Sequence, residues 1–250
     1  MSNIQRENEI MKLLKETSYA TVEYLSQKLF ISPSSIRRDL TNLENRGLVK
    51  RTHGGVSLLS AQPGMAPFSI RLQENRREKV AIVRTASNLI KHGTSIFIDS
   101  STTAINFSTF LTSDMNLTVF TNNISLAHLL ASKHISVYCI GGLVSDCNDV
   151  ITTGSFALEM LDNIYTDMFF FTSSALSKEG IITDTNENET TIRKKMLSHS
   201  KEKVFLCPYN RFSSTAPYRV ANISDVNYIV SEKKLPDSFT GKFNHISYLY

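Results

Sequence analysis

The segment of residues 31–55 constrains the fold of this chain more than any other part of the sequence. Ser32 followed by Pro33 is typical of a helix start, because the hydroxyl caps a free backbone N–H and proline needs no donor at the first helical position. Apolar residues then recur at helical spacing and predict one buried stripe: Ile36, Leu40 and Leu43. Gly47 marks the end of this predicted helix, and the pair Gly54-Gly55 predicts a hairpin after it.

Two further helices are predicted before this segment. Residues 4–15 carry apolar side chains on one face, and Thr21 can cap a short helix that ends near Leu29. A tight turn at Phe30 and Ile31 then leads to the capped helix. Two helices, a short turn, a third helix and a hairpin describe a winged helix-turn-helix domain, which we place at residues 3–58.

The polar face of the third predicted helix suits contact with DNA. Serine, threonine, arginine and histidine side chains can bond phosphate oxygens or base edges. Such side chains lie off the buried stripe or in the predicted wing: Ser32, Ser34, Ser35, Arg37, Arg38, Thr41, Arg51 and His53. An arbitrary arginine pair is more often part of a solvated helix face, but Arg37 and Arg38 stand near the helix start, where base contacts are made. For His53, a phosphate contact and a turn-stabilising role stay equally open.

The positive charge of the chain is concentrated in its first third. The net charge is +4, and residues 1–57 hold nine Lys and Arg against six Asp and Glu. Residues 58–80 hold four against two, whereas residues 81–250 hold fourteen against fifteen. An electrostatic footprint for DNA is therefore expected near the predicted winged helix-turn-helix.

A second domain is predicted after a linker at residues 59–76, which contains several Ser, Pro and Gly residues. A helix is expected from Arg77, and one face of it is expected to be buried: Val80, Val83, Ser87 and Ile90. Near-continuous apolar strands are then predicted at 94–99, 117–121, 135–140, 167–172, 203–207, 226–230 and 245–250, and helices at 102–111, 124–132, 155–161 and 187–200. This alternation predicts an α/β domain over residues 77–250 with a mainly parallel sheet covered on both faces.

Polar clusters follow three of these predicted strands. Ligands of parallel α/β sheets bind beyond the carboxyl ends of the strands. The cluster after the first strand also opens a helix, where hydroxyls and free N–H groups favour an anion. The candidate ligand-binding residues are Asp99, Ser100, Ser101, Thr102 and Thr103, then Thr121, Asn122 and Asn123, then Gly141 and Gly142. Each cluster alone also fits ordinary caps and turns, but three at successive strand ends favour a binding cleft.

Both halves of the sequence resemble the DeoR-type sugar-operon repressors. The N-terminal signature, over residues 3–58, comprises Ser-Pro-Ser-Ser-Ile-Arg-Arg-Asp-Leu, then Leu-Glu, Gly-Leu-Val and Arg-Thr-His-Gly-Gly-Val. In the second half the resemblance rests on Asp99–Thr103, Thr121–Asn123, Gly141-Gly142 and Pro208–Phe212. It implies a sensor domain with a sugar-phosphate-isomerase-like fold, and it adds Arg211 to the effector-binding residues.

Three positions depart from the family's pattern. Ser101 replaces a usual glycine, Pro208 a usual aspartate and Arg211 a usual lysine. Arginine can hold a phosphate bidentately, but the exchange of lysine for arginine changes the geometry of a close-fitting site. These departures favour an alternative in which the chain is a regulator whose effector site has degenerated.

A second alternative is a sugar-phosphate isomerase-like enzyme, which needs a positioned carboxylate base near the substrate carbons. Asp99 is one candidate, and Lys178, Glu179, Glu187 or Glu189 can come near it. The acids at 187 and 189 also fit a solvated helix start. No compact acid–base pair stands out, and a DNA-binding module has no role in such an enzyme, so we do not expect catalysis.

No metal or cofactor motif is evident in the sequence. Three cysteines, Cys139, Cys147 and Cys207, lack metal-ligand spacing, and their odd number argues against a disulfide framework. Cys139 lies in an apolar run and is expected in the core. The N-terminus shows no signal pattern, and no apolar run approaches the ~20 residues of a membrane span. We therefore expect a soluble, cytoplasmic protein without a cofactor.

These features predict a two-domain transcriptional regulator. The expected function is repression of a carbohydrate-utilisation operon, with a phosphorylated sugar as the effector that releases operator DNA. Helix-turn-helix proteins usually bind two half-sites as dimers, so a homodimer or homotetramer is expected. The sequence identifies neither the operon nor the sugar, and activation stays open beside repression.

Overall fold

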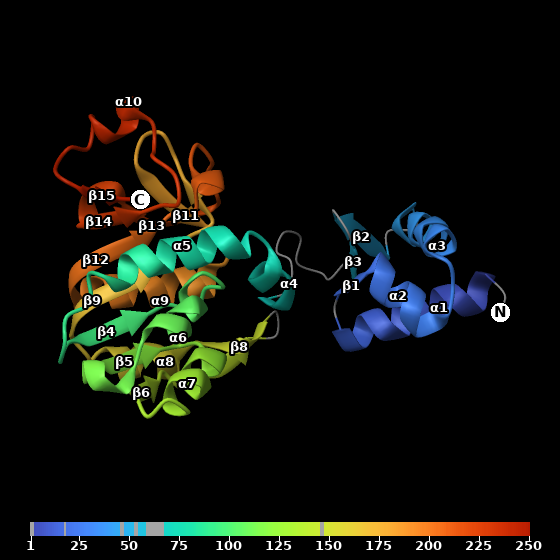
Figure 1. The fold of residues 1–250 in the computed structure, drawn as a ribbon, viewed down its shortest axis with the longest axis horizontal. Helices are drawn as coiled ribbons and strands as arrows, with labels where there is room; N and C mark the ends of the chain where they lie inside the picture. The colour runs from blue at the N-terminus through green and yellow to red at the C-terminus, as the bar shows by residue number, and fades with distance from the viewer. Residues whose placement is uncertain (1–2, 18, 46–47, 53–54, 59–67, 146–147) are drawn as a thin grey trace. The chain divides into compact units, whose positions relative to one another are not determined.

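The computed structural model describes residues 3–17, 19–45, 48–52, 55–58, 68–145 and 148–250. The chain divides into two compact units, residues 1–71 and residues 72–250 (Figure 1). Each unit has its own hydrophobic core.

The first unit is a winged helix-turn-helix, as the sequence predicts. Its elements are α1 (Asn3–Thr17), β1 (Tyr19–Thr21), α2 (Val22–Leu29), α3 (Pro33–Asn45), β2 (Val49–Thr52) and β3 (Gly55–Leu58). The three short strands pair antiparallel in the order β1-β3-β2. Only β1 was not predicted, because three residues are too few to show a strand period.

The predicted caps and core of this unit are confirmed. The Thr21 hydroxyl accepts a hydrogen bond from the Tyr24 N–H at 3.0 Å, and Ser32 Oγ accepts from the Ser35 N–H at 3.4 Å. Pro33 is the first residue of α3. The predicted stripe packs into a fully buried core together with residues of α1, α2 and the strands: Ile10, Leu14, Leu25, Ile36, Leu40, Leu43, Val49 and Val56. The predicted helix end at Gly47 lies outside the described residues.

The stretch predicted as linker contains a helix. α4 spans Phe68–Gln73, and Phe68 is buried. α5 follows at Arg76–Ser87. Its buried face consists of Lys79, Ile82, Val83 and Ala86. Of the predicted face, Val83 and Ile90 are buried, although Ile90 lies beyond the end of the helix, whereas Val80 and Ser87 are half-buried. The aliphatic stem of a lysine can be buried with apolar side chains.

The second unit is built on a seven-stranded sheet in which every neighbouring pair is parallel. The strand order is β15-β14-β12-β9-β4-β5-β6 (Figure 1). The strands are β4 (Ser95–Ile98), β5 (Thr118–Thr121), β6 (Ser136–Cys139), β9 (Thr166–Phe171), β12 (Ser200–Leu206), β14 (Tyr228–Val230) and β15 (Ser247–Leu249). All seven were predicted from sequence, and the predicted α/β class is confirmed.

Helices cover both faces of this sheet. Phe169 and Phe171 of β9 belong to the core that α8 (Ser155–Leu161) and α9 (Glu187–Ser198) cover. Phe170 points the other way and packs against Phe107 of the short helix α6 (Phe107–Phe110). The uninterrupted phenylalanine run is thus explained by burial on both sides. α7 (Ile124–Ala131) follows β5.

One expectation about this unit was wrong, and another was right only in part. The helix predicted at 102–111 is present at residues 104–110, but as a 3₁₀ turn, η1 (Ala104–Asn106), followed by the four-residue α6. Cys139 is exposed, because β6 is the edge strand of the sheet and one side of it is uncovered. Cys207 is buried, and Cys147 lies outside the described residues.

Several short elements were not predicted. The described chain adds β7 (Leu143–Ser145), β8 (Asn148–Thr153), β10 (Ala175–Leu176), β11 (Ile181–Asp184), β13 (Tyr218–Asn222), α10 (Asp237–Thr240), and the 3₁₀ turns η2 (Ser113–Met115), η3 (Tyr209–Arg211) and η4 (Ile223–Asp225). β7 and β8 form a hairpin, and β10, β11 and β13 form a small antiparallel sheet.

Candidate DNA-binding surface and effector site

The outward face of α3 presents the predicted DNA-binding side chains. Ser32, Ser34, Arg37 and Arg38 are exposed, and Ser35 and Thr41 are half-buried. Neither guanidinium has a hydrogen-bond or ion-pair partner within the described part of the chain, so both are available to a ligand. His53, the other candidate in the wing besides Arg51, lies outside the described residues.

Arg51 ties the wing to α3. Its Nη1 donates to Thr41 Oγ1 at 2.9 Å, and its backbone N–H donates to Glu44 Oε1 at 2.9 Å. Thr41 in turn donates to the Arg37 carbonyl at 2.9 Å. These contacts hold strand β2 against the helix and so define the position of the wing relative to Arg37.

An ion pair with a buried carboxylate fixes α3 from its inner side. Asp39 is fully buried, and its two carboxylate oxygens accept from Nε and Nη2 of Arg6 at 2.8 and 2.9 Å. The hydrogen bond to Asp39 raises the pKa of Arg6. Sequence analysis missed this residue, although Asp39 is three residues after Ile36 and four before Leu43, and therefore on the buried stripe.

The predicted effector residues follow strands that are neighbours in the sheet. Loops leave the carboxyl ends of β12, β4, β5 and β6, and the sheet order β12-β9-β4-β5-β6 brings these ends to one edge. All eight residues of the clusters after β4 and β5 are buried: Asp99, Ser100, Ser101, Thr102, Thr103, Thr121, Asn122 and Asn123.

Asp99 anchors its own loop. One carboxylate oxygen accepts from the Ser101 N–H at 3.0 Å, and the other accepts from the Thr172 N–H, beyond β9, also at 3.0 Å. Ser101 Oγ accepts from the Ala104 N–H at 3.0 Å and starts η1. The serine that departs from the family's glycine therefore has a local role in this loop.

The loop after β5 is tied to its neighbours by its asparagines. Asn123 caps α7 by accepting from the Leu126 N–H at 2.9 Å, and it donates to the Ser100 carbonyl at 3.3 Å. Asn122 donates to the Thr152 carbonyl at 2.9 Å. These two side chains thus use their amide groups for structure.

Three buried hydroxyls remain available at this edge. Within the described residues, the side chains of Ser100, Thr102 and Thr103 have no hydrogen-bond partner, although all three are buried. Buried hydroxyls are usually satisfied, so this cluster has unused capacity for a ligand.

The remaining predicted effector residues, Gly141, Gly142 and Arg211, lie on other loops than the three hydroxyls. Gly142 has φ +144°, and a Cβ there would lie 2.4 Å from the Thr153 carbonyl oxygen, so only glycine fits. Gly141 is exposed, and a Cβ there would meet nothing within 4 Å. Arg211, in η3, is half-buried and donates from Nη1 to the Ser174 carbonyl at 3.3 Å.

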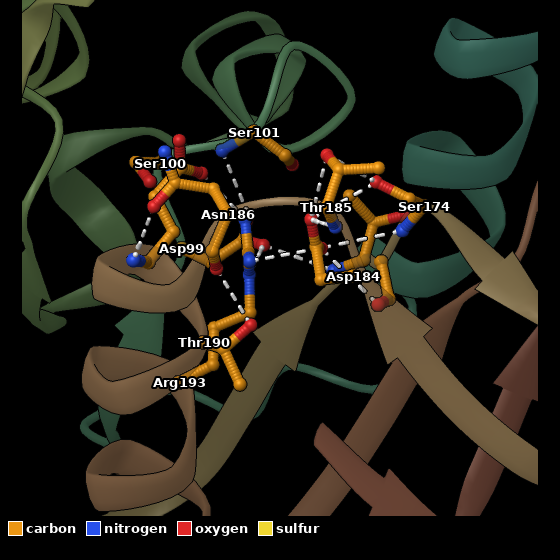
Figure 2. A network of polar contacts seen from close by, with 12 residues as sticks. Asp99, Ser100, Ser101, Ser174, Asp184, Thr185, Asn186, Thr190 and Arg193 are labelled. Carbon is orange, nitrogen blue, oxygen red and sulfur yellow. Dashed lines mark hydrogen bonds and ion pairs between the residues drawn. The ribbon is translucent and has the colours of Figure 1, made fainter. Parts of the chain in front are cut away.

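A buried arginine that sequence analysis missed lies among these loops. Arg193 of α9 bonds three carboxylates: Nε contacts Asp99 at 3.2 Å, Nη1 contacts Asp184 at 3.0 Å, and Nη2 contacts Glu189 at 3.0 Å. Figure 2 shows Arg193 between the Asp99–Ser101 loop and the Ser174–Asp184–Thr185 cluster. For Glu189, the sequence left open a place near Asp99 or a solvated helix start, and the side chain is buried in this network with Asp99.

Asp184 connects the network to the loop after β9. It accepts from the Ser174 hydroxyl at 2.9 Å, the Ser173 hydroxyl at 3.2 Å and the Thr185 N–H at 2.6 Å. Burial by itself raises the pKa of Asp184, but the Arg193 charge and these hydrogen bonds outweigh it and lower the pKa. Burial likewise opposes the charged form of Arg193, and the three carboxylates more than offset it, so its pKa is raised.

Two family profiles match this chain. One, described as a DeoR-like helix-turn-helix domain, covers residues 6–62, and the other, described as a DeoR C terminal sensor domain, covers residues 74–233. The chain belongs to the DeoR family. This confirms the family resemblance and assigns the winged helix-turn-helix to a DNA-binding transcriptional regulator.

Regulators related to this DeoR-family chain match it over most of its length. The HTH-type transcriptional regulator GolR of Listeria innocua is 30% identical, over 97% of this chain and 96% of the relative. The HTH-type transcriptional repressor GlcR of Bacillus subtilis is 29% identical, over 90% of this chain and 86% of the relative. The glycerol-3-phosphate regulon repressor of Escherichia coli is 26% identical, over 95% and 94%.

Among solved structures, ribose 5-phosphate isomerase A of Methanocaldococcus jannaschii is similar at a TM-score of 0.42 and 15% identity, over 56% of this chain and 55% of that chain.

Within the described residues, no group of three or more His, Cys, Asp or Glu side chains is placed to hold a metal ion. No helix in the described part is long and apolar enough to cross a membrane.

Proposed function

We propose that this DeoR-family regulator represses a carbohydrate-utilisation operon and is released from its operator by a phosphorylated sugar. The observation that carries the DNA-binding part is the pair of exposed guanidiniums of Arg37 and Arg38, which have no partner among the described residues and lie near the start of a capped recognition helix. Two relatives that are named as repressors support repression, and a relative that is named as an L-fucose operon activator supports the carbohydrate class but carries the opposite sign.

The effector is proposed to bind at the carboxyl edge of the sheet. The hydroxyls of Ser100, Thr102 and Thr103 and the guanidinium of Arg211 offer donors to a phosphate group. Arg193 is unsuited to hold the phosphate, because three buried carboxylates already surround it. We therefore assign the phosphate to the hydroxyl cluster and Arg211. The sugar hydroxyls are assigned to the buried acids Asp99, Asp184 and Glu189.

The excess of buried acids favours a second candidate, a sensor of a neutral polyol. Asp99, Asp184 and Glu189 face one arginine, and a phosphate dianion placed beside them would be repelled. Calorimetry with a panel of sugar phosphates and the matching free sugars separates the two. Binding of sugar phosphates alone supports the first candidate, and binding of free sugars alone supports the second. Binding of neither supports a degenerated site.

A second copy of the chain is the proposed partner in DNA binding. Residues 135–145 contain no charged residue and include the edge strand β6. Leu143 is 69% exposed and lies against Gly154 at the start of α8, and Phe156 of α8 is 77% exposed. An apolar surface of this kind, without charge over residues 135–145, can pair with itself across a twofold axis.

Operator binding is tested by fluorescence anisotropy with DNA from upstream of this gene and of its neighbours. The Arg37→Ala/Arg38→Ala variant should lose sequence-specific binding, with Arg38→Ala alone weakening it by about 1–3 kcal/mol if it contacts a base. Lys91→Ala/Lys201→Ala removes two exposed charges from the second unit and is the matched control. Wild-type affinity in the arginine variant would contradict the assignment.

A further inference from the structure

Phe30 occupies an unusual position between α2 and α3. Its side chain is 95% exposed. Its backbone is left-handed, with φ 55° and ψ 43°, and its N–H donates to the Ser26 carbonyl as the C-cap of α2. Left-handed caps are usually glycine or asparagine, and a bulky residue at positive φ is an outlier.

The phenylalanine side chain gives no stabilisation at this capping position. A phenylalanine in the left-handed region is disfavoured relative to glycine. An apolar ring gains its hydrophobic free energy by leaving water, and this ring does not leave water in the free chain. Outliers of this kind point to a contact made in another state of the protein.

Hydrogen bonds hold the backbone of this turn next to the recognition helix. The Ile31 N–H donates to the Ser26 carbonyl at 3.1 Å, and the Ser26 hydroxyl donates to the Ile31 carbonyl at 2.5 Å. Ser32, the N-cap of α3, is two residues after Phe30. In helix-turn-helix proteins the first residues of the recognition helix contact base edges in the major groove, so the ring lies near the DNA when α3 is docked.

We propose that Phe30 makes an apolar contact with operator DNA next to the N-terminus of α3. This inference rests on the proposed DNA-binding function and adds a residue to its interface. The partner group is a thymine methyl or the carbon face of a deoxyribose, because these are the apolar groups that B-DNA offers at the groove. Such a contact removes the ring from water only in the complex.

An apolar contact and a phosphate contact differ in how salt affects the binding constant. Loss of a Lys or Arg contact with phosphate lowers the dependence of log K on log salt, because fewer counterions are released. Loss of an uncharged contact weakens binding but leaves that slope unchanged. The two classes of contact are therefore separated by one salt titration for each variant.

The test compares Phe30→Gly, Phe30→Asn and Phe30→Tyr in the full-length protein. Glycine and asparagine suit the left-handed backbone, so these variants should melt at the wild-type temperature or above it, yet bind the operator about tenfold more weakly, as expected for one buried ring. Their salt slopes should equal that of the wild type. Phe30→Tyr, which keeps the ring, should bind like the wild type.

Operator DNA in which deoxyuridine replaces thymidine identifies the partner group. If Phe30 contacts a methyl, the substitution should weaken the wild type as much as Phe30→Gly does and should not affect Phe30→Gly further. If the contact is with deoxyribose, the substitution should leave both affinities unchanged.

Three results would overturn the inference. One is a Phe30→Gly protein that binds the operator as tightly as the wild type. Another is weaker binding accompanied by a lower melting temperature, which would assign Phe30 to folding. The third is unchanged DNA binding with an altered molecular mass, which would assign the ring to a protein partner. Absence of operator binding by the wild type would instead refute the proposed function together with this inference.

Discussion

Among the single residues at the sheet edge, some were predicted from the sequence and others were not. The polar clusters after β4 and β5 were found because they follow recognisable apolar strands. Arg193 was missed because two of its three partners, Asp99 and Asp184, come from other elements of the fold. Only the spacing of Glu189 and Arg193, four residues apart on a helix, gave a local signal. Asp184 gave none, since β11 was not predicted.

Replacement of Arg193 by methionine should destabilise the second unit strongly. The change leaves three buried carboxylates without their cation, and removal of one partner of a buried ion pair typically costs about 3–5 kcal/mol. Chemical denaturation at pH 7 measures the loss. Lys194→Met removes the neighbouring, exposed charge and should have little effect. A similar stability for both variants would contradict the role given to Arg193.

The same network predicts how stability depends on pH. The pKa of Asp184 is lowered in the folded state, so the folded state holds its proton less tightly than the unfolded chain does. This contribution is present above the unfolded pKa, which is about 3.9 for aspartate, and it is lost as pH falls through the folded pKa. Wild-type stability should therefore drop in acid. Asp184→Asn should show a smaller drop, and an equal drop in both proteins would contradict this prediction.

At the level of elements, periodicity and length decided what could be predicted. The seven parallel strands were found because each is an apolar run between turn signals. The β7–β8 hairpin and the small β10-β11-β13 sheet were missed, since these strands are short, polar in part and outside the strand–helix alternation. Cys139 was assigned to the core from the same apolar run that predicted β6, because strand order, and hence the edge position of β6, cannot be read from periodicity.

The cap of α7 is predicted to stabilise two elements together. Asn123→Ala removes the bond from the Leu126 N–H and the bond to the Ser100 carbonyl. Loss of an N-cap typically destabilises by about 0.5–2 kcal/mol, and the loop after β4 should become less ordered. Thermal melting reports the first effect, and hydrogen exchange at residues 99–103 reports the second. Asn163→Ala, at an exposed asparagine, is the control. Unchanged exchange at 99–103 would contradict the link between the two loops.

For the whole molecule, we propose domain limits at residues 3–58 and 77–250, joined by the segment 59–76. A nonspecific protease should cleave first within 59–76 and leave two folded fragments, which mass spectrometry can identify. The fragment 1–58 should bind DNA more weakly than the full chain, because it lacks the proposed assembly surface and the avidity of two half-sites. First cleavage inside either domain would contradict these limits.

Assembly and DNA binding are coupled in this proposal, and one substitution tests the coupling. Phe156→Glu places a charge on the exposed apolar surface that includes Leu143, and two such charges would face each other across a twofold axis. The variant should sediment at the monomer mass while the wild type sediments as a dimer or tetramer. Its affinity for a palindromic operator should fall, whereas its affinity for a single half-site should equal that of the wild type, since α3 is untouched. Tyr165→Glu is the matched control, because Tyr165 is 72% exposed but lies outside residues 135–156. A Phe156→Glu protein with the wild-type mass would place the assembly surface elsewhere on the molecule.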